Sequence, residues 1–462
     1  MPQANKSLKH IVSLSLVTVL LSSCSMIPDF STPQVQTPAR WTADATDAQG
    51  QEIPSAWWTV FGDETLNQLI TTANTNNLDI AAGIERINQS RASLKVAGAS
   101  LLPSAEASLS AGKTRTNPVV GNTRTTTPLS AGLSIGYDLD IFGSNRAANQ
   151  SARATLKASE YTQKALELTT AGDVAEAYFN LLMTRERIKI GNENLKNSNE
   201  LLRIVEARVN AGVDSNLELS QQHVAVSNSE ASLASLKQTE VTYQNALAIL
   251  LGQTPQEFTL TEGDLAKIAI PAIAAGQPST LLERRPDIAS IEQQLLAANA
   301  DIGVARAAYF PSITLGLTAS ATGTGFSDPL GTAFGIASTL TAPIFQGGRL
   351  EGGVELATAK QKELIANYRK TVLTSYGEVE NALSAVQTSS SREQALSRAV
   401  NEAQKAYEIS RKRYQVGTID FATMLDTQAN LLGAEDNYAQ AMKSRLSASL
   451  DLVKSLGGGW KR

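Results

Sequence analysis

The chain has few of the residues on which enzyme and metal sites depend. Its 462 residues include one cysteine and two histidines. A single cysteine excludes a disulfide framework within the chain and leaves no pair of thiols for redox or metal chemistry. His10 lies in the N-terminal segment described below, and we interpret His223 as a solvated helix position. We therefore expect no enzyme activity, no metal site and no cofactor.

The chain also lacks a strong net charge and a long apolar run. Its formal net charge is −4, which gives no reason to expect a nucleic-acid partner. The apolar run at residues 11–21 is too short to cross a bilayer as a helix, which takes about 20 residues, and no later run approaches that length. Beyond a lipid anchor, a membrane role would therefore have to use β-strands.

The N-terminus predicts export and lipidation. Lys6 and Lys9 precede the apolar run, as in a signal peptide, and the run ends in Leu-Ser-Ser-Cys. This ending resembles a bacterial lipobox, in which cleavage leaves the cysteine as an acylated N-terminus. We predict a signal peptide at residues 1–23 and a lipid anchor, with acyl chains such as palmitate, at Cys24. Ser25 follows the cysteine, which favours the outer membrane over retention at the inner one.

Proline is missing from two long stretches, residues 129–254 and the chain from Ile344 onward. Proline costs about 3 kcal/mol in a helix interior, so these stretches permit long helices. Apolar residues recur at seven-residue spacing in both, which is typical of a left-handed supercoil. Each run is interrupted once, at Gly212 and at Gly417, where glycine can adopt positive φ and reverse the chain. Each stretch therefore predicts a helical hairpin.

The chain reads as a duplicated half-molecule. LLPSAEASLSAG at residues 101–112 aligns with YFPSITLGLTAS at residues 309–320, at an offset of 208. ARVNAGVDSNLEL at residues 207–219 aligns with KRYQVGTIDFATM at residues 412–424, at an offset of 205. This period is far longer than that of a solenoid repeat. Each half contains a helix, two strands and a long helical hairpin.

These patterns divide the mature chain into three parts. Residues 24–61 are polar and contain several prolines, which predicts a lipid-anchored, extended tether. Residues 62–270 form the first structural repeat, with strands at 103–115 and 128–140 and a helical hairpin at 145–252. Residues 271–462 form the second, with a helix at 286–308, strands at 311–321 and 334–344, and a hairpin at 347–456.

The four predicted strands raise the question of closure. Residues 129–140 and 313–321 alternate apolar and polar side chains, as do transmembrane strands of about 9–11 residues. A half-buried soluble sheet would show the same alternation. Four strands cannot close a membrane barrel, because open edges leave backbone groups unpaired in lipid. Two copies would supply eight strands and three would supply twelve, and twelve is the smaller number that leaves a pore.

A resemblance to a known family rests on four stretches. They are PSAWWTVFGDETLNQLI from Pro54, LLERRPDIASIEQQLLAANADIGVARAAYFPSITL from Leu281, SYGEVENALSAV from Ser375 and LGGGW from Leu456. With them the chain resembles the outer-membrane factors, the TolC-like exit ducts of tripartite efflux pumps, in the OprM-like lipoprotein branch. The resemblance implies a mixed fold, mostly α: a homotrimer with a 12-stranded transmembrane β-barrel, four strands per chain, a 12-helix periplasmic α-barrel and a mixed equatorial belt.

The resemblance also implies a function. Such a protein is the exit duct of a tripartite pump, here of the RND type, and passively passes drugs or other small compounds from the periplasm of a Gram-negative bacterium through a gated channel. Its partners would be a periplasmic adaptor, an inner-membrane pump and outer-membrane lipid. Alternatives are an exit duct for type I protein secretion or metal-ion efflux, and a structural trimeric surface lipoprotein without a transport role.

Two sets of residues are candidates for these tasks. We expect the hairpin tips to dock onto the adaptor through Arg208, Gly212, Val213, Arg413, Gly417 and Thr418. We expect the periplasmic gate at Asp420 and Asp426, because an inward acid becomes a ring of three in a trimer, and charged rings select ions. Some family members carry a second acid where this chain has Thr423, so one or two acidic rings remain possible, and both acids could also be simply solvated.

One cluster of charges has a structural interpretation. Arg284 and Arg285 precede Pro286 and Asp287, which could suggest a basic site. Proline at a first helical position with an acid in the first turn is instead a helix-start signal. We therefore predict that a helix begins here.

Overall fold

The computed structural model describes residues 25–42, 52–261, 263–325 and 329–462, so the predicted signal peptide and the lipid anchor at Cys24 lie outside the described residues. The chain forms two compact units. The strand unit comprises the described residues up to Gln34, with Arg86–Glu160 and Ser290–Arg369. The hairpin unit comprises Val35–Glu85, Tyr161–Ala289 and Lys370–Arg462.

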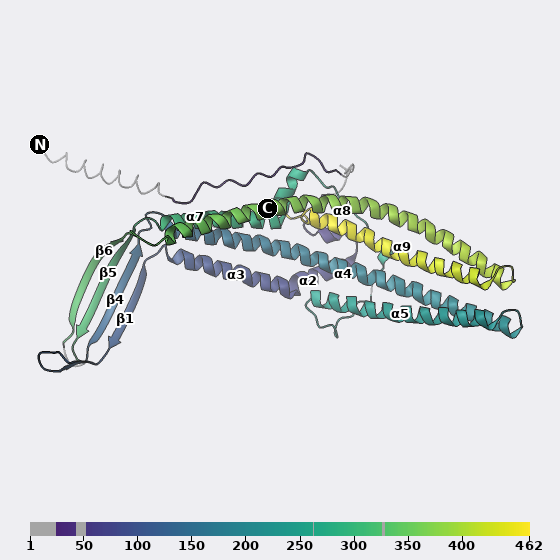
Figure 1. The fold of residues 1–462 in the computed structure, drawn as a ribbon, viewed down its shortest axis with the longest axis horizontal. Helices are drawn as coiled ribbons and strands as arrows, with labels where there is room; N and C mark the ends of the chain where they lie inside the picture. Colours follow the sequence, from purple (N-terminus) through teal and green to yellow (C-terminus); the bar gives the residue numbers. More distant parts are fainter. Residues whose placement is uncertain (1–24, 43–51, 262, 326–328) are drawn as a thin grey trace. The chain divides into compact units, whose positions relative to one another are not determined.

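The strand unit contains a four-stranded antiparallel sheet (Figure 1). Its strands are β1 (Ser104–Ala111), β4 (Leu129–Asp138), β5 (Ser312–Gly323) and β6 (Gly331–Thr341), in the order β1-β4-β5-β6. The two repeats meet at the centre of the sheet, where β4 pairs with β5. A short ribbon of β2 (Thr114–Thr116) and β3 (Arg124–Thr126) lies between β1 and β4 in the sequence. The outer edges of β1 and β6 have no strand beside them within the described chain.

Two strands end at other residues than the sequence predicted, because a nearby proline limits the ladder of backbone hydrogen bonds. The expected strand at residues 103–115 is divided, because β1 pairs with β4 only from Leu129 onward, and the preceding Pro128 has no N–H to donate. The expected strand at residues 334–344 is shifted toward the N-terminus, since Pro343 cannot continue the ladder.

Large apolar side chains at the two edges of this sheet are exposed in the single chain. On β6, Phe334 and Ile336 are 84% and 87% exposed, and on β1 Leu109 is 76% exposed. Exposed apolar surface of this kind marks a contact with lipid or with another protein. The sheet therefore requires a neighbour that the single chain does not supply.

The helices reflect the duplication directly. The two long helices, α4 (Ser144–Asn210) and α8 (Arg349–Gln415), both have 67 residues. Their return helices, α5 (Asn216–Leu250) and α9 (Phe421–Ser455), both have 35. None of the helices in the described ranges is long and apolar enough to cross a membrane. The remaining helical segments are η1 (Trp57–Phe61), α2 (Glu64–Asn76), α3 (Leu78–Ala99), η2 (Leu265–Lys267), η3 (Pro278–Thr280), α6 (Leu281–Arg284) and α7 (Pro286–Ala307).

The core of the hairpin unit packs both repeats together. Trp57 and Phe61 of η1 are buried and meet edge to face, and Phe61 contacts the ring of Phe179 on α4. Leu247 of α5 and Leu450 of α9 belong to the same buried cluster. Because a fully buried Leu or Phe side chain is worth about 1.5–3 kcal/mol, this cluster fixes the positions of α4, α5 and α9.

The N-terminal tether is bound to each unit. In the strand unit the carbonyl of Pro28 accepts a hydrogen bond from Asn299 Nδ2 at 2.8 Å, and Ile27 lies so close to Gly303 that a Cβ there would come within 2.6 Å of it. In the hairpin unit Trp41 is buried, and its Nε1 donates to the carbonyl of Gly276 at 2.9 Å. Residues 25–42 therefore form a docked strap, more restrained than a free linker would be.

Candidate functional site at the hairpin tips

The two hairpin tips have the same backbone turn. Gly212 and Gly417 have φ of 75° and 74°, a left-handed conformation that glycine adopts at no steric cost. After each glycine, the next N–H bonds back into the long helix: Val213 donates to the Arg208 carbonyl and Thr418 donates to the Arg413 carbonyl, both at 2.9 Å. These are the bonds of a helix C-cap with a glycine. The two turns thus end α4 and α8 in the same way.

The return helices also begin at equivalent residues. Ser215 caps α5, and its capping box is completed by Glu218. Asp420, at an offset of 205, caps α9, and its Oδ1 accepts from the N–H of Thr423 at 2.7 Å. This hydrogen bond lowers the pKa of Asp420 below its ordinary value. Asp420, one of the two expected gate acids, therefore has a structural task as a helix cap.

A polar network joins the two tips to each other. Arg208, beside the first tip, holds Asp214 with two hydrogen bonds, Nε to Oδ2 at 2.8 Å and Nη2 to Oδ1 at 2.9 Å. Tyr414, beside the second tip, donates its hydroxyl to Oδ2 of the same carboxylate at 2.6 Å. The Arg208 guanidinium also lies 4.8 Å from the centre of the Tyr414 ring. We call Arg208, Asp214 and Tyr414 the tip triad.

The charges of the tip triad reinforce one another. The hydrogen bond from Arg208 lowers the pKa of Asp214, so this carboxyl is ionised at neutral pH. Burial, and then the hydrogen bond to Asp214, raise the pKa of the Tyr414 hydroxyl, which therefore keeps its proton and remains a donor. Hydrogen bonds to a charged acceptor are worth about 1.5–3 kcal/mol each. The triad can therefore hold the two tips in one arrangement.

A small apolar cluster packs next to the triad and includes one of its members, Tyr414. It contains residues of α4, α8 and α9 that are at most 7% exposed, namely Leu201, Val205, Tyr407, Tyr414, Phe421, Met424 and Leu431. Rings of Tyr414 and Phe421 meet at 5.8 Å between centroids. The Tyr414 ring therefore belongs to the apolar cluster, while its hydroxyl belongs to the polar triad.

The remaining candidates are at the surface of the single chain. Val213 is 63% exposed, and Arg413, Thr418 and Asp426 are also exposed. Cβ atoms built on Gly212 or Gly417 would meet no atom within 4 Å, so both tips have open space around them. Asp426 Oδ2 accepts from Asn430 Nδ2 at 3.1 Å. Within the described residues, no cluster of three or more His, Cys, Asp or Glu side chains could hold a metal ion.

The turns at Gly212 and Gly417 lie where the sequence predicted them, but Asp214 and Tyr414 were not among the predicted candidates. In the sequence, Tyr414 is one of the apolar positions at seven-residue spacing, and Asp214 lies two residues after Gly212. The repeat alignment held a usable signal. At the position of Asp214 the second repeat has Ile419, and at the position of Tyr414 the first repeat has Val209. Asp214 and Tyr414 are thus each replaced by an apolar residue in the other repeat, which indicates that their contact occurs only once in the chain.

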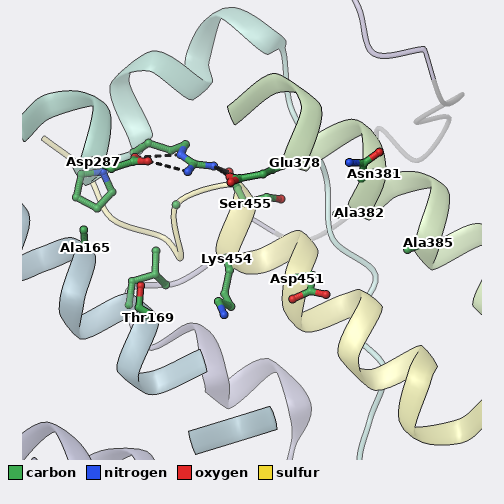
Figure 2. A pocket seen from close by; sticks show the side chains of 14 residues that line it. Ala165, Thr169, Asp287, Glu378, Asn381, Ala382, Ala385, Asp451, Lys454 and Ser455 are labelled. Carbon is green, nitrogen blue, oxygen red and sulfur yellow. Dashed lines mark hydrogen bonds and ion pairs between the residues drawn. The ribbon is translucent and has the colours of Figure 1, made fainter. Parts of the chain in front are cut away.

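The arginine-rich run at the start of α7 has the structural role that was expected. Pro286 is the first residue of α7, and Arg285 pairs with Asp287 in its first turn at 2.8 Å. Arg285 also pairs with Glu378 of α8 at 2.6 Å, and Figure 2 labels Asp287 and Glu378, the two acids that it joins. Its Nη1 donates to the last-turn carbonyl of Ser455 at 3.0 Å. Arg285 therefore ties α7, α8 and α9 together beside a pocket of about 540 Å³.

Both repeats match one protein family. The match to the outer membrane efflux protein family covers residues 69–253 and residues 277–458. The chain belongs to the outer membrane efflux protein family. Each matched segment contains one hairpin tip, so the tip geometry described above lies inside the part of the chain that defines membership.

Individual members of the outer membrane efflux protein family are similar over the full length. The pyoverdine export outer membrane protein OpmQ of Pseudomonas putida is 36% identical, over 98% of this chain and 98% of that protein. The toluene efflux pump outer membrane protein TtgC of Pseudomonas putida is 31% identical, over 98% and 96% respectively. The structure of the outer-membrane channel OprN matches with a TM-score of 0.86 and 30% identity, over 95% of this chain and 100% of that chain. These likenesses confirm the resemblance to outer-membrane factors and the TolC-like fold of the chain.

Proposed function

We propose that this protein is the gated outer-membrane exit duct of a tripartite efflux pump and that it passes small organic compounds passively from the periplasm to the outside. Membership of the efflux protein family supports this function. The similarity to relatives named for pyoverdine export and toluene efflux supports small organic compounds as the cargo. The observation that carries the proposal is the four-stranded sheet, whose β1 and β6 edges have exposed apolar side chains and no partner strand among the described residues.

Three copies of the chain would pair the open β1 and β6 edges of this sheet. A membrane strand must pair on both sides, because an unpaired backbone group in lipid costs several kcal/mol. In a homotrimer β6 of one copy would pair with β1 of the next and close a twelve-stranded barrel. Phe334, Ile336 and Leu109 would then face lipid or a neighbouring copy, which removes their apolar surface from water.

The hairpin tips would meet a periplasmic adaptor, which an inner-membrane pump of the RND type supplies with substrate. The exposed, glycine-containing turns support this role, since bare turns let another protein approach the backbone closely. The tip triad and the Asp426 carboxylate lie next to these turns. We assign the resting closure of the duct to the triad and ion selection to Asp426, which would form a ring of three carboxylates in the trimer.

The docking role can be tested with Gly417→Trp. The substitution adds a bulky ring at the tip and backbone strain of about 1–2 kcal/mol, but it displaces no core side chain. We expect pump-dependent drug resistance to fall while trimer yield and outer-membrane location stay normal. The control is Val119→Trp, at a fully exposed loop residue of the strand unit. Unchanged susceptibility to pump substrates in Gly417→Trp cells would rule out docking at this turn.

The lipid anchor can be tested with Cys24→Ala. A thioether-linked lipid requires the cysteine sulfur, so we expect metabolic labelling with palmitate to disappear while export continues. Acyl chains bind membranes through about 0.8 kcal/mol per buried CH₂. Equal palmitate labelling of wild type and variant would contradict the assignment of Cys24 as the acylated residue.

A further inference from the structure

The pocket beside Arg285 lies within the hairpin unit, where α9 ends and α7 begins (Figure 2). Its walls come from α4, α8, α9 and the start of α7. Its volume of about 540 Å³ lies in the range of about 300–1,000 Å³ that is typical of small-molecule sites. None of the residues that line it belongs to the tip triad or to the sheet, so the roles assigned above leave this pocket without a task.

Both cations of the pocket are already engaged. Arg285 is held by the two carboxylates described above and by the carbonyl of Ser455. Lys454 Nζ lies 3.8 Å from a carboxylate oxygen of Asp173 on α4. The side chain of Lys454 also lies against Gly172, where an added Cβ would come within 2.6 Å of Lys454 Cδ. Lys454 is therefore drawn toward α4 and away from the other acid on its own helix.

That acid, Asp451, has no partner. The pocket is lined by two cations, Arg285 and Lys454, and by three acids, Asp287, Glu378 and Asp451. Within the described ranges, no hydrogen bond or ion pair joins the Asp451 carboxylate to another group. The pKa of Asp451 is raised, mainly because the surrounding protein takes its carboxyl partly out of water. A cation bound in the pocket would stabilise the charged form of this group.

The rest of the lining combines polar groups with apolar surface. Thr169 of α4 and Asn381 of α8 line the pocket, and their side chains form no hydrogen bond to other groups in the part of the chain that the structure describes. Leu168 and Ala382 add apolar surface, and Ala382 is 5% exposed. Apolar walls with a few convergent polar groups are typical of sites for small organic molecules.

We propose that this pocket binds a small organic cation, with the ammonium group of the cation at Asp451 and its apolar body against Leu168 and Ala382. An ammonium group donates up to three hydrogen bonds, and the Asp451 carboxylate, the Thr169 hydroxyl and the Asn381 amide oxygen are acceptors in the same pocket. The excess of acids over cations in the lining favours a cation over an anion.

The pocket lies on the side of the helices that is turned away from the buried core and the strap. Leu450 of α9 belongs to the buried cluster, and Asp451 follows it by one position, which turns its side chain by about 100°. Tyr376 of α8 donates to Thr37 of the strap, whereas Asn381 lies five positions further on, about 140° around the helix. In the proposed duct, with the belt outside the helices, this side would face the lumen. The inference rests on the proposed function for this role, a binding site that organic cations meet on their passage.

Two fluorescent probes that differ only in charge test the site. Dansylcadaverine ends in a primary ammonium group, and its N-acetyl derivative is neutral. Binding of each probe to the purified full-length protein in an uncharged detergent is measured by fluorescence anisotropy. We expect the wild type to bind the ammonium probe at least about tenfold more tightly than the acetyl probe. Asp451→Asn, which keeps the size of the side chain and removes its charge, should abolish most of this preference.

Two further variants serve as controls. Glu230→Gln removes a carboxylate from an exposed position of α5 that does not line the pocket, so we expect it to keep the preference of the wild type. Thr169→Trp adds a bulky ring at an exposed lining position, so we expect both probes to bind more weakly. Undiminished binding of both probes to Thr169→Trp would show that they bind elsewhere and would overturn the inference.

The outcomes separate this inference from the proposed function. A preference that is lost in Asp451→Asn and kept in Glu230→Gln supports the site. Equal affinities for the two probes in the wild type, or a preference that Asp451→Asn leaves unchanged, would overturn the site and leave the exit duct intact. A protein that prefers the ammonium probe but forms no channel in a planar bilayer would contradict the proposed function and leave the site standing.

Discussion

Tyr414→Phe is expected to raise the open probability of the resting duct by at least about tenfold. The substitution removes the hydroxyl that donates to Asp214 at 2.6 Å and keeps the ring that packs on Phe421. A hydrogen bond to a charged group is worth about 1.5–3 kcal/mol, and each 1.4 kcal/mol is a factor of about ten in an equilibrium constant. Since the proposed trimer would have three such bonds, the effect should be large in single-channel recordings in planar bilayers.

Tyr407→Phe is the matched control for this experiment. Tyr407 belongs to the same buried cluster, so its variant loses a hydroxyl from the same environment without touching the tip triad. We expect Tyr407→Phe to conduct as the wild type does. If both variants open equally, or if neither does, the tip triad is not what holds the duct closed.

The triad also predicts how closure depends on pH. The pKa of Asp214 is lowered in the folded protein by Arg208, so the stabilisation by this carboxylate is fully present above the ordinary aspartate pKa. It is lost only as the pH falls through the lowered value. Closure by the triad should therefore be constant between neutral and mildly acidic pH, and a loss of closure in that range would point to another group.

Asp426→Ala is expected to reduce cation selectivity and to weaken the block of the duct by multivalent cations. If Asp426 faces the lumen, three carboxylates approach one another in the trimer, and hard cations prefer such oxygen ligands. In the proposed trimer the substitution would remove three negative charges at once. Reversal potential and block from the periplasmic side, measured in planar bilayers, would report the change.

Asp420→Asn is the control for Asp426→Ala. Asparagine still caps a helix, so this variant keeps the hydrogen bond to the Thr423 N–H while it would remove three charges from the proposed trimer. We expect it to change selectivity less than Asp426→Ala does. Selectivity and block that are untouched in Asp426→Ala would show that this residue does not line the constriction, even if the fold and the pump role are right.

The sequence predicted the hairpins well because their causes are local. A proline-free run, a seven-residue apolar spacing and a glycine that reverses the chain all act within a few residues of one another. The turns at Gly212 and Gly417 lie where the interruptions of the pattern indicated. Strand ends were less predictable, since Pro128 and Pro343 limit the ladders through the missing N–H and not through side-chain alternation.

The candidate site could be predicted only in part, because its decisive contacts join residues far apart in the sequence. Asp214 and Tyr414 are 200 positions apart, and no local pattern brings their side chains together. Arg208 was predicted as a docking residue, which stays a prediction, and its ion pair with Asp214 within the chain was not predicted. The role of Asp420, in contrast, could have been predicted from the sequence. Asp420 aligns with Ser215 in the first repeat, and both residues cap the helix that follows the hairpin turn.

The most direct test of the account is the electrical conductance of the purified protein in a planar lipid bilayer. An exit duct closed by the tip triad should give discrete, cation-selective steps that are small in the wild type and much larger in Tyr414→Phe. A bilayer that stays silent with both proteins, although each inserts as a trimer, would contradict a transport role and favour a structural surface lipoprotein.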